Sequence, residues 1–230
     1  MKFGVVVFPG SNCDMDMIYV LETIMGQRVV KLWHKDTDLQ EVDFIILPGG
    51  FSYGDYLRSG AIAKFSPIMK QVIGFAKAGG YVMGICNGFQ ILTESGLLPG
   101  ALLHNTSHQF ICKNIYLKAI TTNTLITNKY SEKAIKIPIA HGEGRYFADD
   151  QTLNTLINND QILFKYCDQN GLINDRANPN GSLMNIAGIC NKERNVFGMM
   201  PHPERAADKE LENQDGRALF DSIIKCLSVA

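Results

Sequence analysis

The stretch 81-YVMGICNGFQIL-92 decides the fold, because it places a cysteine between two glycines where an apolar strand passes into a helix. Its first five residues are apolar, as in a strand that is buried on both faces. The segment 84-GICNG-88 fits the G-x-nucleophile-x-G elbow, in which a strand turns sharply into a helix. Such a turn crowds the backbone, so positions without a Cβ are needed on both sides, and Gly84 and Gly88 provide them. The stretch therefore predicts Cys86 at the carboxyl end of a central strand.

Strand and helix patterns alternate along the chain on both sides of this stretch. The first half predicts strands at 2–8, 29–34, 43–48 and 81–85, a helix closed by Gly26 and a helix over 67–78. Such strand–helix–strand units indicate a parallel sheet with helices on both faces. The second half predicts strands at 109–120, 135–141, 161–167, 183–190 and 196–200, and a last helix over about 215–227. We therefore expect one α/β domain over residues 1–230, with a mostly parallel central sheet and a partly antiparallel later portion.

Composition narrows the class of protein and of partner. The chain has 230 residues, of which 46% are hydrophobic and 20% charged, and its net charge is −1. This near-neutral balance gives no reason to expect a nucleic-acid partner, and the apolar runs are too short to span a membrane. The six cysteines form no C-x-x-C pair, which argues against a metal site and against a disulfide scaffold. We expect a cytoplasmic protein without a bound metal.

Cys86 would stand at a helix N-terminus, where unpaired N–H groups favour a thiolate. The backbone N–H of Asn87 would point to the space in which a tetrahedral oxyanion forms. These features predict a nucleophile, although a buried structural cysteine would also fit the turn. Cys13 likewise follows a strand and precedes a helix, but it lacks the pair of glycines. We therefore interpret Cys13 as structural.

A candidate base for this thiol lies in 196-VFGMMPHPER-205, where His202 stands between two prolines. Each proline holds the residue before it in extended geometry, and residues two apart in an extended chain project to the same side. Glu204 would therefore face His202 and fix its tautomer. Among the other histidines, His141 is the rival candidate, because the glycines of 141-HGEGR-145 permit close approach to a ligand.

The third part of the predicted site is 47-LPGGFSYGDYLRSGA-61, which follows the strand over 43–48. The backbone at Gly49 and Gly50 can aim N–H groups at a ligand at the carboxyl edge of the sheet, where open α/β sheets bind ligands. Gly50 or Phe51 would supply a second oxyanion donor. Since all three motifs follow a strand, we expect them to meet at one edge of the sheet.

The order of cysteine, histidine and glutamate, with Pro-Gly-Gly upstream, resembles the class I (triad) glutamine amidotransferases from Met1 to the last helix. This resemblance implies a flavodoxin-like fold. Within the class, five stretches look like the glutaminase subunit of phosphoribosylformylglycinamidine synthase, an enzyme of purine biosynthesis. They are 7-VFPGSNCD-14, 47-LPGGFSYGDYLRSGAIA-63, 84-GICNGFQIL-92, 141-HGEGRY-146 and 198-GMMPHPER-205.

The resemblance implies a reaction and a role for each site residue. Cys86 would attack the side-chain amide of glutamine, ammonia would leave, and a thioester would remain. Water would then hydrolyse the thioester to give glutamate. His202, oriented by Glu204, would protonate the departing ammonia and then activate the water. Gly50 and Asn87 would form the oxyanion hole. The implied glutamine-binding residues are Gly49, Phe51, Gln90, Ser107 and Phe110.

The resemblance also implies a partner, because free ammonia would be protonated and lost in water. A synthetase subunit would use the ammonia, with ATP and magnesium, to convert formylglycinamide ribonucleotide to formylglycinamidine ribonucleotide. A small third subunit is a further candidate partner. The chain has no Walker loop and is too short to hold the synthetase, so no cofactor is expected in it. The expected partner contacts are Tyr53, Arg58, His141, Glu143 and Arg145.

Two other functions remain open. A thiol hydrolase or peptidase of similar topology would use the same cysteine elbow, but it would not require the Pro-His-Pro-Glu arrangement or a partner. A non-catalytic binding subunit would keep the fold and have no need of an intact triad. Comparing hydrolysis of glutamine with hydrolysis of peptides distinguishes a glutaminase from a thiol hydrolase or peptidase. The activity of Cys86→Ala distinguishes a catalytic subunit from a non-catalytic binding subunit.

Overall fold

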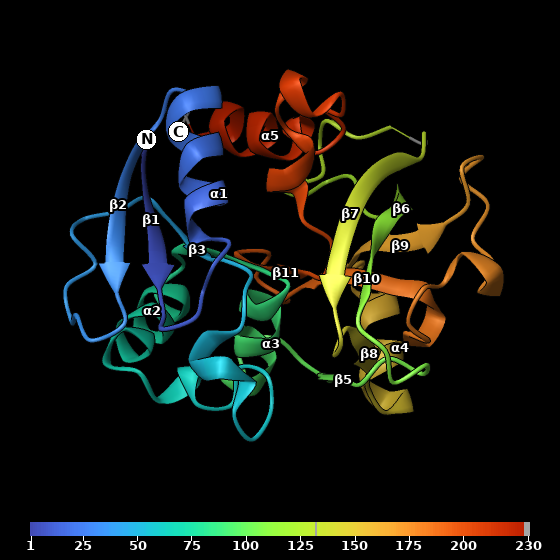
Figure 1. Ribbon diagram of the computed structural model, residues 1–230, viewed down its shortest axis with the longest axis horizontal. Coiled ribbons are helices and arrows are strands. Elements are labelled where there is room, and N and C mark those ends of the chain that lie inside the picture. The colour runs from blue at the N-terminus through green and yellow to red at the C-terminus, as the bar shows by residue number, and fades with distance from the viewer. Residues whose placement is uncertain (132, 228–230) are drawn as a thin grey trace.

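A nine-stranded sheet organises the chain, and the computed structural model describes residues 1–131 and 133–227 (Figure 1). The strands are β1 (Lys2–Val7), β2 (Arg28–Trp33), β3 (Phe44–Leu47), β4 (Tyr81–Ile85), β5 (Ala101–Leu103), β6 (Ile111–Ala119), β7 (Ile135–His141), β8 (Arg145–Phe147), β9 (Ile162–Cys167), β10 (Ile186–Cys190) and β11 (Val196–Met199). The helices are α1 (Asp14–Tyr19), α2 (Pro67–Lys77), α3 (Asn87–Glu94), α4 (Asp150–Asn158) and α5 (Arg217–Leu227). Residues 132 and 228–230, which fall within the predicted domain, lie outside the described residues.

The main sheet has the strand order β2-β1-β3-β4-β11-β10-β9-β6-β7. From β2 through β1, β3 and β4 to β11, each pair of neighbouring strands is parallel. From β11 through β10, β9 and β6 to β7, each pair is antiparallel. The predicted α/β sheet with an antiparallel later portion is therefore confirmed. The chain crosses back to place β11 beside β4, and this pairing builds the site described below.

Helices cover both faces of the parallel part of the sheet. In Figure 1, α1 and α5 lie above these strands and α2 and α3 below them. All four residues of β3 are buried, because both faces of the strand are covered. Pro67 stands at the start of α2, where its missing N–H is not needed, and Ile68 and Val72 point into the core. The carboxyl ends of β3, β4 and β11 lie side by side, because these three strands are parallel neighbours.

Three elements have no counterpart in the sequence predictions. β5 and β8 contain three residues each and pair with each other, and they are too short to display a period of two. α4 buries only Leu156, so its apolar stripe is too narrow to recognise. Its start did carry a signal, because the Asp149 side chain accepts a hydrogen bond from the Thr152 N–H at 2.8 Å, as an N-cap does.

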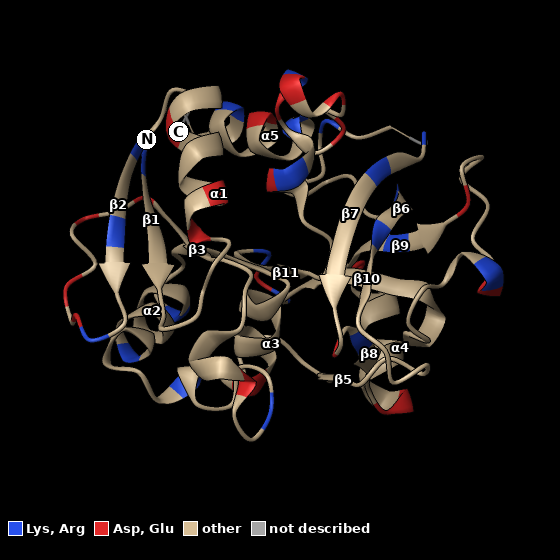
Figure 2. Ribbon diagram, viewed as in Figure 1, with Lys and Arg blue, Asp and Glu red and all other residues tan. Residues whose placement is uncertain are grey.

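Charged side chains are distributed over many elements. Figure 2 shows Lys and Arg interleaved with Asp and Glu along the ribbon. Within the described residues, no helix has the length and apolar character that crossing a membrane requires.

Candidate active site

Cys86 lies in the tight turn between β4 and α3. Its backbone has φ 50° and ψ −107°, a positive-φ conformation that costs a residue with a Cβ about 1–3 kcal/mol. A Cβ added at Gly84 would lie 2.5 Å from the carbonyl carbon of Gly88, and one added at Gly88 would lie 1.9 Å from the carbonyl oxygen of Leu47. The predicted elbow is confirmed, and its two glycines are required because backbone occupies the space of a side chain.

The pairing of β4 with β11 brings His202 to this cysteine. A Cβ added at Gly49 would lie 2.7 Å from Cε1 of His202 and 3.4 Å from Cβ of Cys86, so the two side chains meet over Gly49. Cys86 is 4% exposed and His202 is 1% exposed. The Cys86 sulfur lies 3.7 Å from the Ala140 carbonyl oxygen, and it also favours a proton on the imidazole of His202. A buried thiol next to an imidazole is what a nucleophile and its base require.

His202 and Glu204 are in contact, but not for the reason that the sequence indicated. The hydrogen bond from Nδ1 of His202 to Oε1 of Glu204 measures 2.6 Å, and both side chains are buried. The segment Pro203–Ala206 forms a 3₁₀ turn, so the extended geometry expected beyond His202 is wrong. Only His202 keeps a non-helical backbone, as the following proline requires. The turn then swings the carboxylate back onto the imidazole.

The surroundings of His202 favour its charged form. Burial opposes the charge, but the carboxylate of Glu204 and the sulfur of Cys86 outweigh burial and raise the pKa of His202 to about 10. The imidazole therefore holds a proton at neutral pH and can pass it to a leaving group.

Replacing Glu204 with glutamine is expected to lower the pKa of His202, because the change removes the charge and keeps the shape. The folded-state pKa of about 10 lies above the ordinary 6.5, so the stability from this charge is complete below 6.5 and is lost as the pH rises through 10. The variant should lose its imidazole proton at a lower pH than the parent protein, as measured by NMR titration of His202. Glu193→Gln, at an exposed position, is the control, and an unchanged titration in Glu204→Gln would contradict the assigned cause.

Two backbone N–H groups beside the thiol have no acceptor among the described residues. Asn87 is the first residue of α3, where an N–H has no intrahelical partner. Gly50, with φ 130°, is the other. The N–H of Phe51 donates to the Gly10 carbonyl oxygen at 2.9 Å, which excludes Phe51 as the alternative oxyanion donor. The Asn87 side chain accepts a hydrogen bond from the Ser52 N–H at 3.1 Å, and this contact holds the two loops together.

A small cavity of about 140 Å³ opens at Cys86. It is lined by Gly50, Phe51, Asp55, Ser59, Cys86, Gln90, His104, Phe110, Ala140, His141, Gly142 and Glu143. Of the residues expected to bind glutamine, Phe51, Gln90 and Phe110 line this cavity, Gly49 lies against the His202 ring and Cβ of Cys86, and the exposed Ser107 lies outside it. The cavity therefore combines a nucleophile with polar groups suited to a small polar ligand.

The side chain of Gln90 is held at both ends. Its Nε2 donates to the Glu143 carbonyl oxygen at 2.6 Å, and its Oε1 accepts from Nδ2 of Asn87 at 2.9 Å.

Asp55, which the sequence interpretation missed, lines the same cavity. Burial raises the pKa of Asp55 to about 6, and the nearby Glu143 carboxylate raises it further. A hydrogen bond with Ser59 acts in the opposite direction and lowers this pKa. Its place in the glycine-containing loop after β3 was the available signal.

The residues expected at a partner contact separate into two groups. His141 and Glu143 line the cavity, and His141 is only 3% exposed. Tyr53 is half-buried, and its hydroxyl hydrogen-bonds inside the protein. Arg58 forms an ion pair with part of α3, and Nε of Arg145 donates to a loop carbonyl at 2.9 Å. Only the two arginines keep a charged group near the surface.

Cys13 lies closer to this cluster than its sequence pattern indicated. Its sulfur and the ligand atoms of His202 and Glu204 all lie within 4.8 Å of one another. Burial raises the pKa of the Cys13 thiol to about 12, so the thiol stays protonated. Arg205 donates to this sulfur through Nη2 at 3.1 Å and to Asp16 through Nε at 3.0 Å. Because a guanidinium already contacts the sulfur and would repel a metal cation, we interpret Cys13 as a hydrogen-bonded support.

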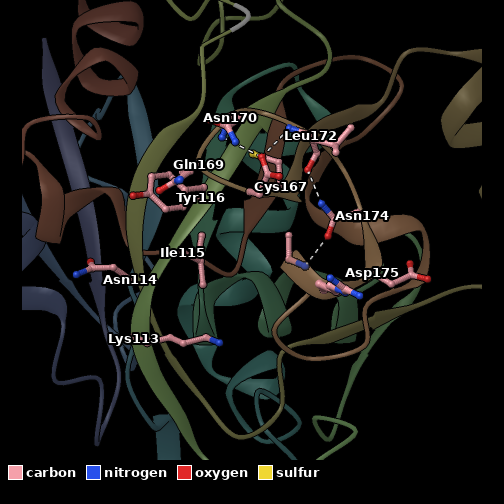
Figure 3. Close-up of a pocket in the computed structure, with 13 residues that line it drawn as sticks. Lys113, Asn114, Ile115, Tyr116, Cys167, Gln169, Asn170, Leu172, Asn174 and Asp175 are labelled. Atoms are coloured by element: carbon pink, nitrogen blue, oxygen red, sulfur yellow. Dashed lines mark hydrogen bonds between the residues drawn. The ribbon is translucent and has the colours of Figure 1, made fainter.

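A larger cavity, of about 900 Å³, lies between β6 and the turn after β9 and shares no lining residue with the small one (Figure 3). Its thiol belongs to Cys167, and burial raises the pKa of that group to about 11. None of the described residues that line it is a histidine. Cavity volume therefore does not locate the active site in this protein, because the reactive side chains line the small cavity at Cys86.

Comparison with known proteins identifies the family. The chain matches the CobB/CobQ-like glutamine amidotransferase domain over residues 1–219. It is 58% identical to the phosphoribosylformylglycinamidine synthase subunit PurQ of Moorella thermoacetica, over 97% of this chain and 95% of that protein. It is 55% identical to the PurQ subunit of Trichormus variabilis, over 98% and 97% of the two chains. A chain in the structure of PurLQS from Thermotoga maritima is 44% identical, with a TM-score of 0.86 over 98% of both chains. This chain therefore belongs to the glutamine amidotransferase family and, within it, to the PurQ subunits of phosphoribosylformylglycinamidine synthase.

Proposed function

We propose that this chain is the glutaminase subunit of phosphoribosylformylglycinamidine synthase and hydrolyses glutamine to glutamate and ammonia. The observation that carries the proposal is the buried arrangement of Cys86, His202 and Glu204 beside a small cavity. Membership of the PurQ family supports it, since those relatives carry the name of this enzyme.

The proposed reaction begins with the thiol proton held on His202. The sulfur of Cys86 attacks the carboxamide carbon, a C–S bond forms, and the N–H groups of Gly50 and Asn87 hold the oxyanion. His202 then donates its proton to the nitrogen as the C–N bond breaks, and ammonia leaves. In the second half, neutral His202 removes a proton from water, the hydroxide attacks the thioester, and glutamate leaves as the C–S bond breaks. Glu204 keeps the imidazole oriented and stabilises its charge throughout.

Glutamine would occupy the small cavity with its carboxamide at Cys86. The rings of Phe51 and Phe110 lie 6.1 Å apart at its mouth, where they would cover the bound amino acid. Gly49 and Gln90 would shape its walls, and Ser107 would contribute from the adjoining loop. Asp55 and Glu143 place carboxylates in the same cavity, which suits the ammonium group of an amino acid.

The ammonia would pass to a synthetase subunit that uses ATP and magnesium to amidate formylglycinamide ribonucleotide. The solved assembly PurLQS, which contains a chain similar to this one, supports a synthetase partner and a small third subunit.

We also propose that residues 1–230 form one amidotransferase domain, supported by the main sheet, whose strands come from β1 through to β11. Six free cysteines favour a reducing compartment, and hence the cytoplasm.

Replacing Arg145 with alanine is expected to reduce the stimulation of glutaminase activity by the synthetase, with a smaller reduction in Arg58→Ala. Both side chains keep a charged group near the surface beside the cavity, and a lost charged contact at an interface costs about 1–3 kcal/mol. The measurement is ammonia release with and without the synthetase. Arg28→Ala, on the far edge strand β2, is the control, and unchanged stimulation in both test variants would remove the interface assignment.

The decisive test of the function is ammonia release from glutamine by the purified chain, alone and with the synthetase. Release of ammonia from glutamine, with peptides left intact, supports a glutaminase rather than a peptidase. Labelling of Cys86 by a glutamine-like electrophile would locate the nucleophile. Hydrolysis of peptides but not of glutamine would overturn the proposal.

A further inference from the structure

The hydrogen-bond network around Asn105 determines which nitrogen of His141 carries the proton. Nδ2 of Asn105 donates to the carbonyl oxygens of Gln109 at 2.8 Å and His141 at 2.9 Å. Its Oδ1 is therefore the acceptor end, and it also receives the Gly144 N–H at 3.1 Å. Nδ1 of His141 lies 3.1 Å from this same oxygen, so Nδ1 must be the donor. In the neutral imidazole, Nε2 consequently carries a lone pair and no proton.

This lone pair has no hydrogen-bond donor among the residues that the structure describes. Nε2 of His141 is buried and has no hydrogen-bond partner among the described residues, although a buried acceptor is normally paired. The side chain is 3% exposed and lines the small cavity at Cys86. Burial, together with the positive charge on His202, lowers the pKa of His141 to about 4, so the ring stays neutral. A residue that lines the cavity therefore holds an acceptor nitrogen that no described residue satisfies.

We propose that His141 is a substrate-binding residue whose Nε2 accepts a hydrogen bond from the carboxamide N–H of glutamine. This inference rests on the proposed glutaminase function. The carboxamide is the end concerned, because Ala140, the residue before His141, contacts the Cys86 sulfur at 3.7 Å, at the reacting end of the cavity. The carboxylates of Asp55 and Glu143 act on each other and suit the ammonium end of the ligand.

Such a contact has two consequences for the reaction. Holding one N–H of the carboxamide directs the lone pair that develops on the nitrogen towards the proton of His202. It also separates substrate from product, because the side-chain carboxylate of glutamate has no proton to donate and would face the lone pair of Nε2. A site that requires a donor rejects a ligand that lacks one, since its own polar group is then left unpaired. His141 would therefore assist the release of glutamate.

The test compares two replacements of similar size in the complex with the synthetase subunits. His141→Met removes the acceptor, and His141→Gln can place an amide oxygen near the position of Nε2. We expect kcat/KM for glutamine to fall by about 10- to 100-fold in His141→Met and to recover to within about fivefold of the parent in His141→Gln. Inhibition by glutamate should be unchanged or stronger in His141→Met. His108→Ala, at an exposed position outside the cavity, is the control.

The outcomes separate this inference from the proposed function. A parent complex that releases no ammonia from glutamine would overturn the proposed function itself. If the parent is active, equal activity in His141→Met and His141→Gln, or equal weakening of glutamine and glutamate binding in His141→Met, would overturn the role of His141 alone. Thermal unfolding and alkylation of Cys86 report whether each variant keeps the fold. If His141→Met does not fold, the activity of His141→Gln is compared directly with that of the parent.

Discussion

Replacing Cys86 with alanine is expected to abolish glutamine-dependent amidation while ammonia-dependent amidation by the complex continues. The sulfur is the only atom at this turn that can form the thioester, so its removal should lower glutamine hydrolysis by about 10⁴-fold or more. The synthetase reaction with added ammonia does not pass through Cys86 and should keep its parent rate. The measurement is product formation by the complex with glutamine or with an ammonium salt as the nitrogen donor.

Cys13→Ala is the matched control, because Cys13 lies beside the same histidine and glutamate. Its thiol stays protonated and is occupied by Arg205, so its loss should change glutamine hydrolysis by less than about tenfold. A comparable loss in both variants would mean that the two thiols act together. Full glutamine-dependent activity in Cys86→Ala would end the catalytic interpretation.

Replacing Gly88 with alanine is expected to have the largest effect on stability. The added Cβ would lie 1.9 Å from the carbonyl oxygen of Leu47 in the buried strand β3, and neither backbone can move without disturbing the sheet. We expect a loss of about 4 kcal/mol or more in the free energy of unfolding, or failure to fold. Equilibrium unfolding in urea, followed by circular dichroism, gives the free energy.

Gly74→Ala provides the opposite case in the same protein. Gly74 lies inside α2, and a Cβ there would meet nothing within 4 Å. Because alanine is the better helix former, this change should stabilise the protein by about 0.5–1 kcal/mol. If Gly88→Ala remained within 1 kcal/mol of the parent protein, the crowding at the elbow would not be what the coordinates indicate.

The sequence predicted the long, strongly patterned elements and missed the short ones. The strands of the first half and the helix at 67–78 lie within a residue or two of the predicted bounds, because buried strands and amphipathic helices have distinct periods. β5, β8 and α4 were missed, since three-residue strands and a helix with one buried side chain leave almost no periodic signal. The helix closed by Gly26 was foreseen, but its last turn, Val20–Ile24, is π-helical.

Parts of the candidate site were predicted with the right residues and an incomplete geometry. Glu204 does contact His202, but through a 3₁₀ turn rather than an extended chain. His141, which was expected at a partner contact, also lines the cavity, and Cys13, which was interpreted as structural, lies against His202 and Glu204. The positions of His141 and Cys13 depend on where their segments pack, which neighbouring residues in the sequence do not specify, whereas Glu204 reaches His202 through a local turn.

Sequence alone determined the features that act over a few bonds. The turn around Cys86 needs glycine at 84 and 88, because backbone atoms fill the space that a Cβ would take. A proline excludes helix at the residue before it, and this marks His202. Both residues could therefore be named as candidates from the sequence. Tertiary structure decided which of these groups meet. The pairing of β4 with β11 joins segments more than a hundred residues apart, and it is this pairing that brings His202 to Cys86. Strand order depends on contacts spread over the whole sheet, and for that reason no local stretch of this chain encodes it.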